Sequence, residues 1–277
     1  MRWLSLVFCF CAAAQAEVSV VDDYGHTVRL PAPARRIVSL APHLTELVHA
    51  AGGGASLVGA VDYSDYPPAA RNLPRVGSDA HINIEAVLAL KPDLIVAWPN
   101  AGSVRAIDSL ARLGLPVFRS EPRELDDIAT TIERLGVLTG SVREAEREAR
   151  AFRARLATLE KHYAAQPRLR VFYQVWDRPL VTVNGAHVIS KVIALCGGEN
   201  VFAHLPLIAP EVDAEAVLRA KPDVVVTSAS GAKPPVWLRD ARFAVVPADL
   251  IQRHTPRLLD GAEQVCRILE RVRAARS

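Results

Sequence analysis

The side chains best able to catalyse a reaction or bind a metal are scattered along this sequence. Its eight histidines occur singly, at positions 26, 43, 49, 81, 162, 187, 204 and 254. There is no Cys-x-x-Cys, His-Glu-x-x-His, P-loop, Gly-x-Gly-x-x-Gly or Gly-x-Ser-x-Gly motif. We therefore expect no catalytic residues, no metal site and no resident cofactor, and we predict that the protein is not an enzyme.

Asp249 and Arg253 have the spacing of a helical side-chain pair. On these residues alone the favoured interpretation is a surface ion pair, worth about 0.3 kcal/mol. Arginine can also offer forked donors to a ligand, with a carboxylate to orient it. A tyrosine such as Tyr63 can pack against a ligand ring while its hydroxyl keeps a hydrogen bond.

The first sixteen residues have the pattern of a secretory signal peptide. Arg2 is followed by a short apolar run, and Ala14-Gln15-Ala16 is a small-x-small cleavage site. Cleavage after Ala16, rather than lipidation, is the favoured outcome. It leaves residues 17–277 with Cys196 and Cys266 as their cysteines. In an oxidising compartment we expect these two to pair, although two buried free thiols are the alternative.

The charge balance gives no reason to expect nucleic acid or anionic membrane as a partner. The formal net charge of the whole chain is +3, and no stretch concentrates lysine and arginine with aromatic residues. No segment after the leader has the length of apolar sequence that a membrane helix needs. We expect a soluble, exported protein of two modest lobes.

A repeated unit is the most informative internal feature. Residues 85–93 read EAVLALKPD, and residues 215–223 read EAVLRAKPD. In each copy Asn83 or Asp213 can cap a short helix, which a proline ends before a β-branched strand. The repeat predicts one such helix and one buried parallel strand in each half of the chain.

The wider pattern alternates strands with helices, which predicts an α/β fold with a mainly parallel sheet in each lobe. Expected strands are 36–40, 57–61, 94–98, 116–118, 170–175, 224–228 and 243–246. Expected helices besides the repeated ones are 45–51, 103–113, 189–196 and 256–274.

A different segment separates the halves. Apolar residues from Val142 to Tyr163 recur at steps of three and four, which predicts one long amphipathic helix. Such a helix spans roughly 33 Å and would form a strut between the two lobes, the alternative being a solvated helix packed on them. The expected organisation is a signal peptide at 1–16, lobes at 17–140 and 166–277, and a connecting helix at 141–165.

Three strings resemble the periplasmic cobalamin-binding proteins of an ABC importer, members of the helical-backbone substrate-binding superfamily. They are Tyr63-Ser-Asp-Tyr-Pro-Pro68 with Thr45-Glu46 before it, Cys196-Gly-Gly-Glu-Asn200, and Pro256-Arg257 before Cys266. The resemblance covers residues 34–272. It implies two Rossmann-like lobes joined by one long helix, a ligand in the cleft between them and a disulfide between Cys196 and Cys266.

The resemblance also implies residue roles. Tyr63 of the first lobe and the segment Asp249-Leu250-Ile251-Gln252-Arg253 of the second are expected to contact cobalamin or a related corrinoid. Glu85 and Glu215, which begin the two repeats, are expected to dock onto arginines of the ABC permease, one glutamate per lobe. The alternative for each glutamate is stabilisation of its own helix dipole, worth about 0.3–1 kcal/mol. The implied protein is a periplasmic monomer.

The sequence departs from that family at three positions. Asp79, Val181 and Ala209 stand where the family has aromatic residues lining the cleft, and Trp176 or His81 could compensate. The departures leave open a different corrinoid, such as cobinamide. They also leave open a haem or siderophore protein of the same fold, with Tyr63, His43 or His81 as a haem ligand. A metal-ion binder or a hydrolase is disfavoured by the scattered histidines and the missing nucleophile.

Overall fold

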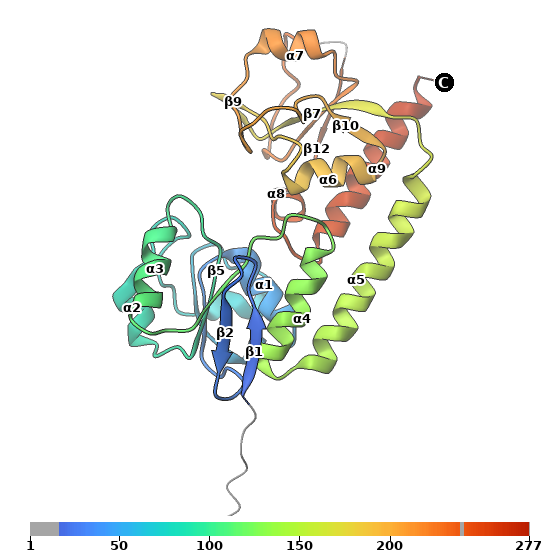
Figure 1. The fold of residues 1–277 in the computed structure, drawn as a ribbon. Helices are drawn as coiled ribbons and strands as arrows, with labels where there is room; N and C mark the ends of the chain where they lie inside the picture. Colours follow the sequence, from blue (N-terminus) through green and yellow to red (C-terminus); the bar gives the residue numbers. More distant parts are fainter. Residues whose placement is uncertain (1–16, 239–240, 277) are drawn as a thin grey trace, which may run out of the picture.

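The computed structural model describes residues 17–238 and 241–276. It has two α/β lobes, each built on a parallel sheet, joined by one long helix (Figure 1). This confirms the predicted fold class. The predicted signal peptide lies outside the described residues, and the lobe limits at 17–140 and 166–277 stay a prediction. None of the helices in the described part of the chain combines the length and apolar character needed to cross a bilayer.

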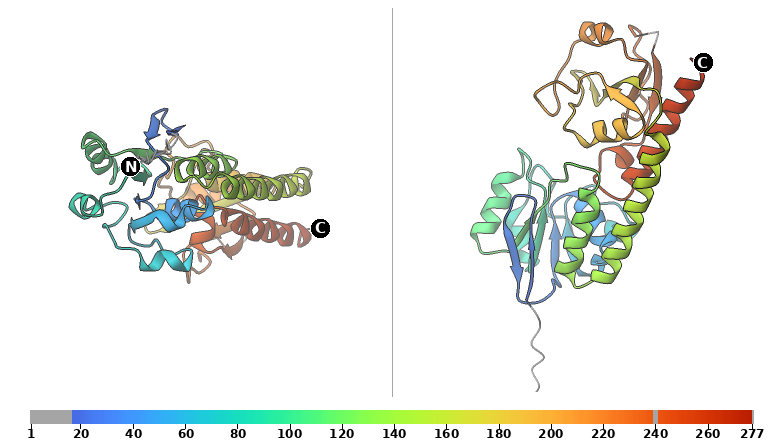
Figure 2. Two further views of the ribbon diagram at one scale, coloured as in Figure 1. Left: turned by 90° about the horizontal axis from the view of Figure 1, so that it is seen from below. Right: turned by 45° about the vertical axis from the view of Figure 1, so that its right-hand side comes forward.

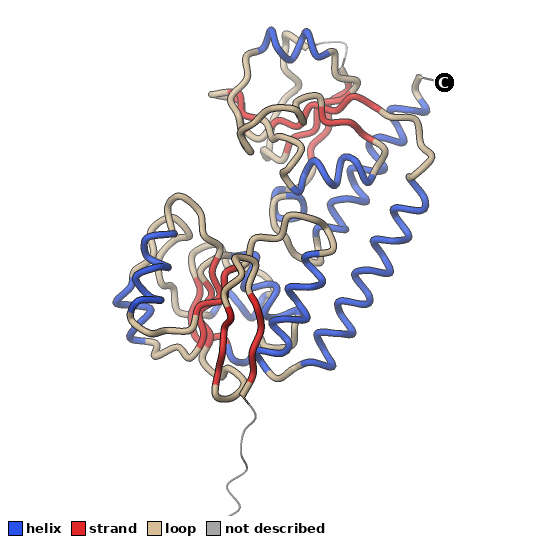
Figure 3. Tube along the Cα trace, in the orientation of Figure 1, coloured by secondary structure: helices blue, strands red, loops and turns tan. Residues whose placement is uncertain are grey.

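The first lobe has a four-stranded parallel sheet in the order β4-β3-β5-β6. Its strands are β3 (Ile37–Ser39), β4 (Leu57–Ala60), β5 (Leu94–Ala97) and β6 (Val117–Arg119). Its helices are α1 (Pro42–Ala50), α2 (Ile84–Ala89), α3 (Val104–Arg112) and α4 (Asp127–Thr139). An antiparallel hairpin, β1 (Val18–Val21) and β2 (Thr27–Leu30), packs on α4. Helices therefore cover both faces of this sheet (Figure 3).

The second lobe repeats this design with the parallel sheet order β10-β7-β11-β12. Its strands are β7 (Leu169–Gln174), β10 (Gly198–Asn200), β11 (Val224–Thr227) and β12 (Arg242–Val245), with a small hairpin of β8 (Trp176–Asp177) and β9 (Leu180–Val181). Its helices are α6 (Val188–Leu195), α7 (Ala214–Ala220), α8 (Ala248–Ile251) and α9 (Leu258–Ala274).

The repeated units fold alike. Asn83 Oδ1 accepts from Ala86 N at 3.0 Å, and Asp213 Oδ1 accepts from Ala216 N at 2.6 Å, so both predicted helix caps are confirmed. The burial classes match residue by residue over 81–97 and 211–227. Each unit is therefore the same helix-and-strand module, placed once in each lobe.

In each module an arginine outside the repeat binds the carboxyl end of the helix. Arg36 Nη2 donates to Leu90 O at 2.7 Å at the end of α2, and Arg170 Nη2 donates to Ala220 O at 2.8 Å at the end of α7. The carboxylates of Asp93 and Asp223, the last residues of the repeats, accept from the backbone N–H of the same two arginines. The Lys-Pro-Asp ending is thus tied to the start of the first strand in each lobe.

The predicted strut is α5 (Val142–Tyr163). Six of its seven predicted stripe residues are buried, and Val142 at the first turn is the exception. The buried stripe belongs to a hydrophobic cluster that is continuous from the first lobe to the second, with Phe152 and Leu156 between them. Figure 2 shows α5 and α9 side by side, and Arg155 of α5 binds Asp260 and Glu263 of α9.

Some elements differ from those expected. The helix predicted at 45–51 starts earlier, at Pro42, because proline is favoured in a first helical turn. Helix α4 was not predicted, since Thr130, Thr131 and Gly136 lower its helix propensity. The first hairpin was also missed, although Asp-Tyr-Gly25 between two alternating runs is a turn signal.

The predicted disulfide is present. Cys196 and Cys266 are joined with a Cα–Cα distance of 4.7 Å, which fixes the end of α6 to the middle of α9. Both cysteines are fully buried. The bond therefore links α6 of the second lobe to α9, the helix that runs beside α5.

Removing this link is expected to destabilise the protein without changing its fold. The bond closes a separation of 70 residues, so the Cys196→Ala/Cys266→Ala variant should lose about 4 kcal/mol of unfolding free energy. Urea denaturation measures this loss. Reductant should destabilise the wild type by a similar amount and leave the double variant unchanged. Equal urea midpoints for wild type and variant would contradict the prediction.

Candidate functional site

Each lobe has a crevice between the carboxyl ends of two neighbouring strands, β3 and β5 in the first lobe and β7 and β11 in the second. Open α/β sheets bind ligands at crevices of this kind. In each lobe the connections run in opposite directions from the first strand, β3 or β7, so a crevice opens at its carboxyl end toward β5 or β11. Trp98 follows β5 at the first crevice, and Ser228 follows β11 at the second.

The loop that carries Tyr63 follows β4, and hydrogen bonds to buried side chains hold it in place. Ser64, next to Tyr63, is fully buried, and its Oγ lies 3.1 Å from Thr45 Oγ1, which is itself 2.9 Å from Ser39 Oγ. Arg75 donates to the carbonyls of Val61 and Ser64 at 3.0 Å each. This network holds the backbone while the Tyr63 side chain stays outside it.

Tyr63 itself is 78% exposed and has a backbone φ of +62°. A left-handed conformation is uncommon for a residue with a large side chain and persists only where its surroundings impose it. The anchored loop therefore presents an exposed aromatic ring in a fixed place. This is a suitable arrangement for packing against a flat ligand.

The predicted second-lobe residues lie in and just after α8. Asp249 is exposed, Leu250 is half-buried and Ile251 is fully buried. The side-chain amide of Gln252 donates to Ser228 Oγ at 2.7 Å. Leu250 and Ile251 thus pack mainly within the lobe, whereas Asp249 and Arg253 carry the polar groups of the segment.

The surface ion pair between Asp249 and Arg253 is not formed. Helix α8 ends at Ile251, so Arg253 lies beyond it and the helical four-residue spacing does not apply. Asp249 instead lies 3.8 Å from Arg257, while Arg253 reaches across to Glu46 and Asp65 of the first lobe. The polar ends of the predicted site therefore meet at the lobe junction.

Four charged residues form what we call the junction cluster: Glu46 and Asp65 of the first lobe, and Arg253 and Arg257 of the second. Glu46 accepts from Arg253 Nη1 at 2.8 Å and from Arg257 Nη2 and Nε at 2.7 and 2.9 Å. Asp65 accepts from Arg253 Nη1 at 2.7 Å. Arg257 also lies 3.9 Å from the centre of the Tyr66 ring, a cation–π contact.

The cluster keeps its arginines charged. Burial on its own would lower the pKa of Arg253, but the hydrogen bonds with Glu46 and Asp65 outweigh burial and raise that pKa. The pKa of Arg257 is raised mainly by its bonds with Glu46. Burial would raise the pKa of Asp65, yet Arg253 holds it below its usual range. These ion pairs therefore persist at neutral pH.

Two histidines meet beside the cluster. The rings of His43 and His254, from opposite lobes, lie 5.7 Å apart, and Trp98 lies 5.6 Å from His43. Burial, then the nearby charges of His254 and Arg253, lowers the pKa of His43 to about 3. Burial also lowers the pKa of His254 to about 4. Both rings are therefore neutral at neutral pH, and the His43 ring is enclosed rather than presented to a ligand.

The three positions expected to be aromatic in the family carry aspartate, valine and alanine. Val181 pairs directly with Trp176 across the β8–β9 hairpin and with Glu211 on its other side. Trp176 is 61% exposed. Directly opposed residues share a face of the ribbon, so the indole stands beside the side chain of Val181. Asp79 is half-buried and Ala209 exposed.

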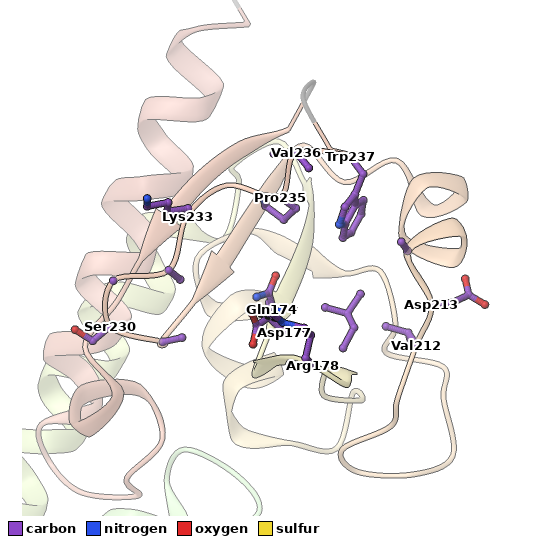
Figure 4. A pocket seen from close by; sticks show the side chains of 15 residues that line it. Gln174, Asp177, Arg178, Val212, Asp213, Ser230, Lys233, Pro235, Val236 and Trp237 are labelled. Atoms are coloured by element: carbon purple, nitrogen blue, oxygen red, sulfur yellow. Dashed lines mark ion pairs between the residues drawn. The ribbon is translucent and has the colours of Figure 1, made fainter.

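A separate pocket lies wholly in the second lobe. It has a volume of about 880 Å³ and opens at the carboxyl ends of β7 and β11 (Figure 4). Gln174, Arg178, Lys233 and Trp237 are among its lining residues. It contains none of the residues predicted to bind a ligand, so the predicted site and this pocket are separate features.

The sequence predicted Arg253 as a site residue but missed the part of Glu46, Asp65 and Arg257 in joining the lobes. Glu46 and Arg257 occur in the strings that carry the family resemblance, but nothing local assigned them to each other. The one available signal was a glutamate among Leu44, Leu47 and Val48, the apolar side of its helix. Among the described residues, no group of three or more His, Cys, Asp or Glu could hold a metal ion.

Comparison with known proteins gives consistent matches. The periplasmic binding protein family matches residues 37–255. The vitamin B12-binding protein of Vibrio cholerae is 41% identical over 250 residues, covering 87% of this chain and 91% of that protein. The crystal structure of periplasmic BtuF from Vibrio cholerae has a TM-score of 0.82, covering 87% of this chain and 98% of that one at 41% identity.

A periplasmic heme binding protein from Pseudomonas aeruginosa is a more distant structural match. Its TM-score is 0.74 at 26% identity, over 84% of this chain and 91% of that one. The family match runs from β3 through α8, so it includes both sheets, the strut and three of the four residues of the junction cluster, Arg257 being outside it. Since the match extends over most of its length, the chain belongs to the periplasmic binding protein family.

Proposed function

We propose that this protein captures cobalamin or a related corrinoid between its lobes and delivers it to an ABC importer. The observation that carries the proposal is the exposed ring of Tyr63 beside Arg253 at the lobe junction. It occurs in a chain that is 41% identical to a vitamin B12-binding protein. A flat, amide-rich macrocycle needs both an aromatic surface and hydrogen-bond donors.

Each predicted residue has a role that its place supports. Tyr63 packs on the corrin ring. Arg253 uses one Nη2 hydrogen and both Nη1 hydrogens within the protein. Its Nε–H and second Nη2–H are then the donors for corrin amides or the nucleotide phosphate. Asp249 accepts from ligand amides, and Leu250, Ile251 and Gln252 hold the segment in place.

A haem or other tetrapyrrole is the alternative ligand. The structural match to a heme binding protein supports it at the level of fold. The exposed phenol of Tyr63 is available as an iron ligand, as is exposed His81, whereas the buried His43 is not. Replacement of family aromatics by Asp79, Val181 and Ala209 makes a different corrinoid, such as cobinamide, a second ligand to test.

We further propose that residues 1–16 are a signal peptide removed after Ala16 and that the mature protein acts in the periplasm as a monomer. It carries its ligand as cargo, without a catalytic residue or a cofactor of its own. Glu85 and Glu215 dock onto the permease. They occupy equivalent exposed positions in α2 and α7, on the outer surfaces of the two lobes (Figure 1).

Calorimetry tests ligand identity directly. Titration of the purified protein with cobalamin, cobinamide and haem should show one corrinoid site per chain. Tyr63→Ala should weaken corrinoid binding roughly tenfold, because it removes an aromatic contact of about 1.4 kcal/mol. The control is Tyr24→Ala, which removes an exposed tyrosine from the turn of the first hairpin.

Two results would contradict this assignment. One is the absence of heat with both corrinoids. The other is a haem Soret shift in the wild type that disappears in Tyr63→Ala or in a His81→Ala variant. The second result would assign the site to haem.

Charge reversal tests docking separately from binding. Glu85→Arg/Glu215→Arg should keep the wild-type affinity for corrinoid but lose at least tenfold in affinity for the permease, because cross-interface charges of like sign repel. Pull-down with the reconstituted permease measures this. Glu160→Arg, on the exposed side of α5, is the control. Unchanged permease binding by the double variant would indicate that each glutamate only stabilises its own helix.

A further inference from the structure

A single buried carboxylate holds two arginines of the opposite lobe. Glu46 lies on α1 of the first lobe, and its side chain is only 3% exposed. Arg253 and Arg257, each 17% exposed, come from the second lobe, more than two hundred residues along the chain. A buried carboxylate is costly unless it is paired and hydrogen-bonded. Glu46 is therefore satisfied only when the lobes are in this arrangement.

The geometry shows that the pairing is specific. Arg257 binds both carboxylate oxygens, with Nε on Oε2 and Nη2 on Oε1, which is the forked arrangement that fixes direction as well as distance. Arg253 donates to Oε1 as well, through Nη1. Glu46 thus sets the orientation of both guanidinium groups.

The same contacts extend to the predicted ligand surface. Arg253 Nη2 donates to the carbonyl oxygen of Tyr63 at 3.1 Å, and Nη1 donates to Asp65 at 2.7 Å. These two bonds hold the chain at Tyr63, whose backbone is left-handed, and at Asp65, two residues further on. A chain of contacts therefore runs from Glu46 through Arg253 to the exposed aromatic ring.

We propose that Glu46 is a positioning residue that locks the two lobes together and, through Arg253, holds Tyr63 in its ligand-facing conformation. The part concerning the ligand rests on the proposed function, whereas the locking of the lobes does not. The carboxylate touches no ligand. It acts by fixing the residues that do.

Glu46→Gln is the sharpest test, because it keeps the shape of the side chain and removes its charge. Spin labels at Leu113→Cys and Leu218→Cys, exposed positions on opposite lobes, report the distance between lobes without ligand. We expect a broadened or shifted distance distribution. We also expect cobalamin affinity to fall at least about tenfold.

A double-variant cycle separates positioning from general structural support. If Glu46 acts through Arg253, then Glu46→Gln/Arg253→Gln should bind cobalamin within about twofold of Arg253→Gln alone. Glu263→Gln is the matched control. It removes a carboxylate that binds Arg155 at 2.7 Å between α5 and α9, and it should change neither the lobe distance nor the affinity.

The proposal is overturned if Glu46→Gln keeps the wild-type distance distribution. It is also overturned if the loss of cobalamin affinity in the double variant equals the product of the losses in Glu46→Gln and Arg253→Gln. If Glu46→Gln does not fold, Asp65→Asn serves as the substitute test. The Asp65 side chain is 49% exposed and binds the same arginine, Arg253. About a threefold loss of affinity is expected there, and full affinity would overturn the proposal. If the wild type binds no cobalamin, the proposed function fails, and the lobe distances alone decide the locking role.

Discussion

The structure depends on one buried negative charge at the junction of its lobes. Glu46 cannot be left unpaired where it lies, and its partners Arg253 and Arg257 belong to the other lobe. On the far side the lobes share a hydrophobic core along α5. An apolar connection and an ionic one together restrict rotation of the lobes more than a single helix would. The proposed ligand residues are placed where the ionic connection ends.

The two lobes that meet at this junction are built on the same helix-and-strand module. Each lobe contains the same capped helix and buried strand, tied to its first strand by Arg36 or Arg170. The modules present Glu85 and Glu215 at equivalent positions, one on each lobe. A rigid arrangement of the lobes would keep the spacing of these two acids constant, which suits the proposed docking onto a permease.

Local patterns predicted much of this fold, and pairings distant in sequence escaped prediction. The caps at Asn83 and Asp213, the stripe of α5 and the disulfide all follow from short-range spacing or from export. Helix α4 was missed because its threonines and glycine favour other structures, although packing on α5 stabilises it. Arg253 and Arg257 gave no sign of their common partner, because Glu46 lies on the other lobe, more than two hundred residues away in the sequence.

The central claim is that the ligand lies at the lobe junction, against Tyr63 and Arg253, while Glu46 keeps its two arginines. A crystal structure of the cobalamin complex tests it most directly. The account predicts the corrin ring packed on Tyr63, with the Arg253–Glu46 bond intact and the remaining hydrogens of Arg253 directed at the ligand. Cobalamin bound instead in the second-lobe pocket beside Gln174 and Trp237, or an Arg253 released from Glu46, would contradict it.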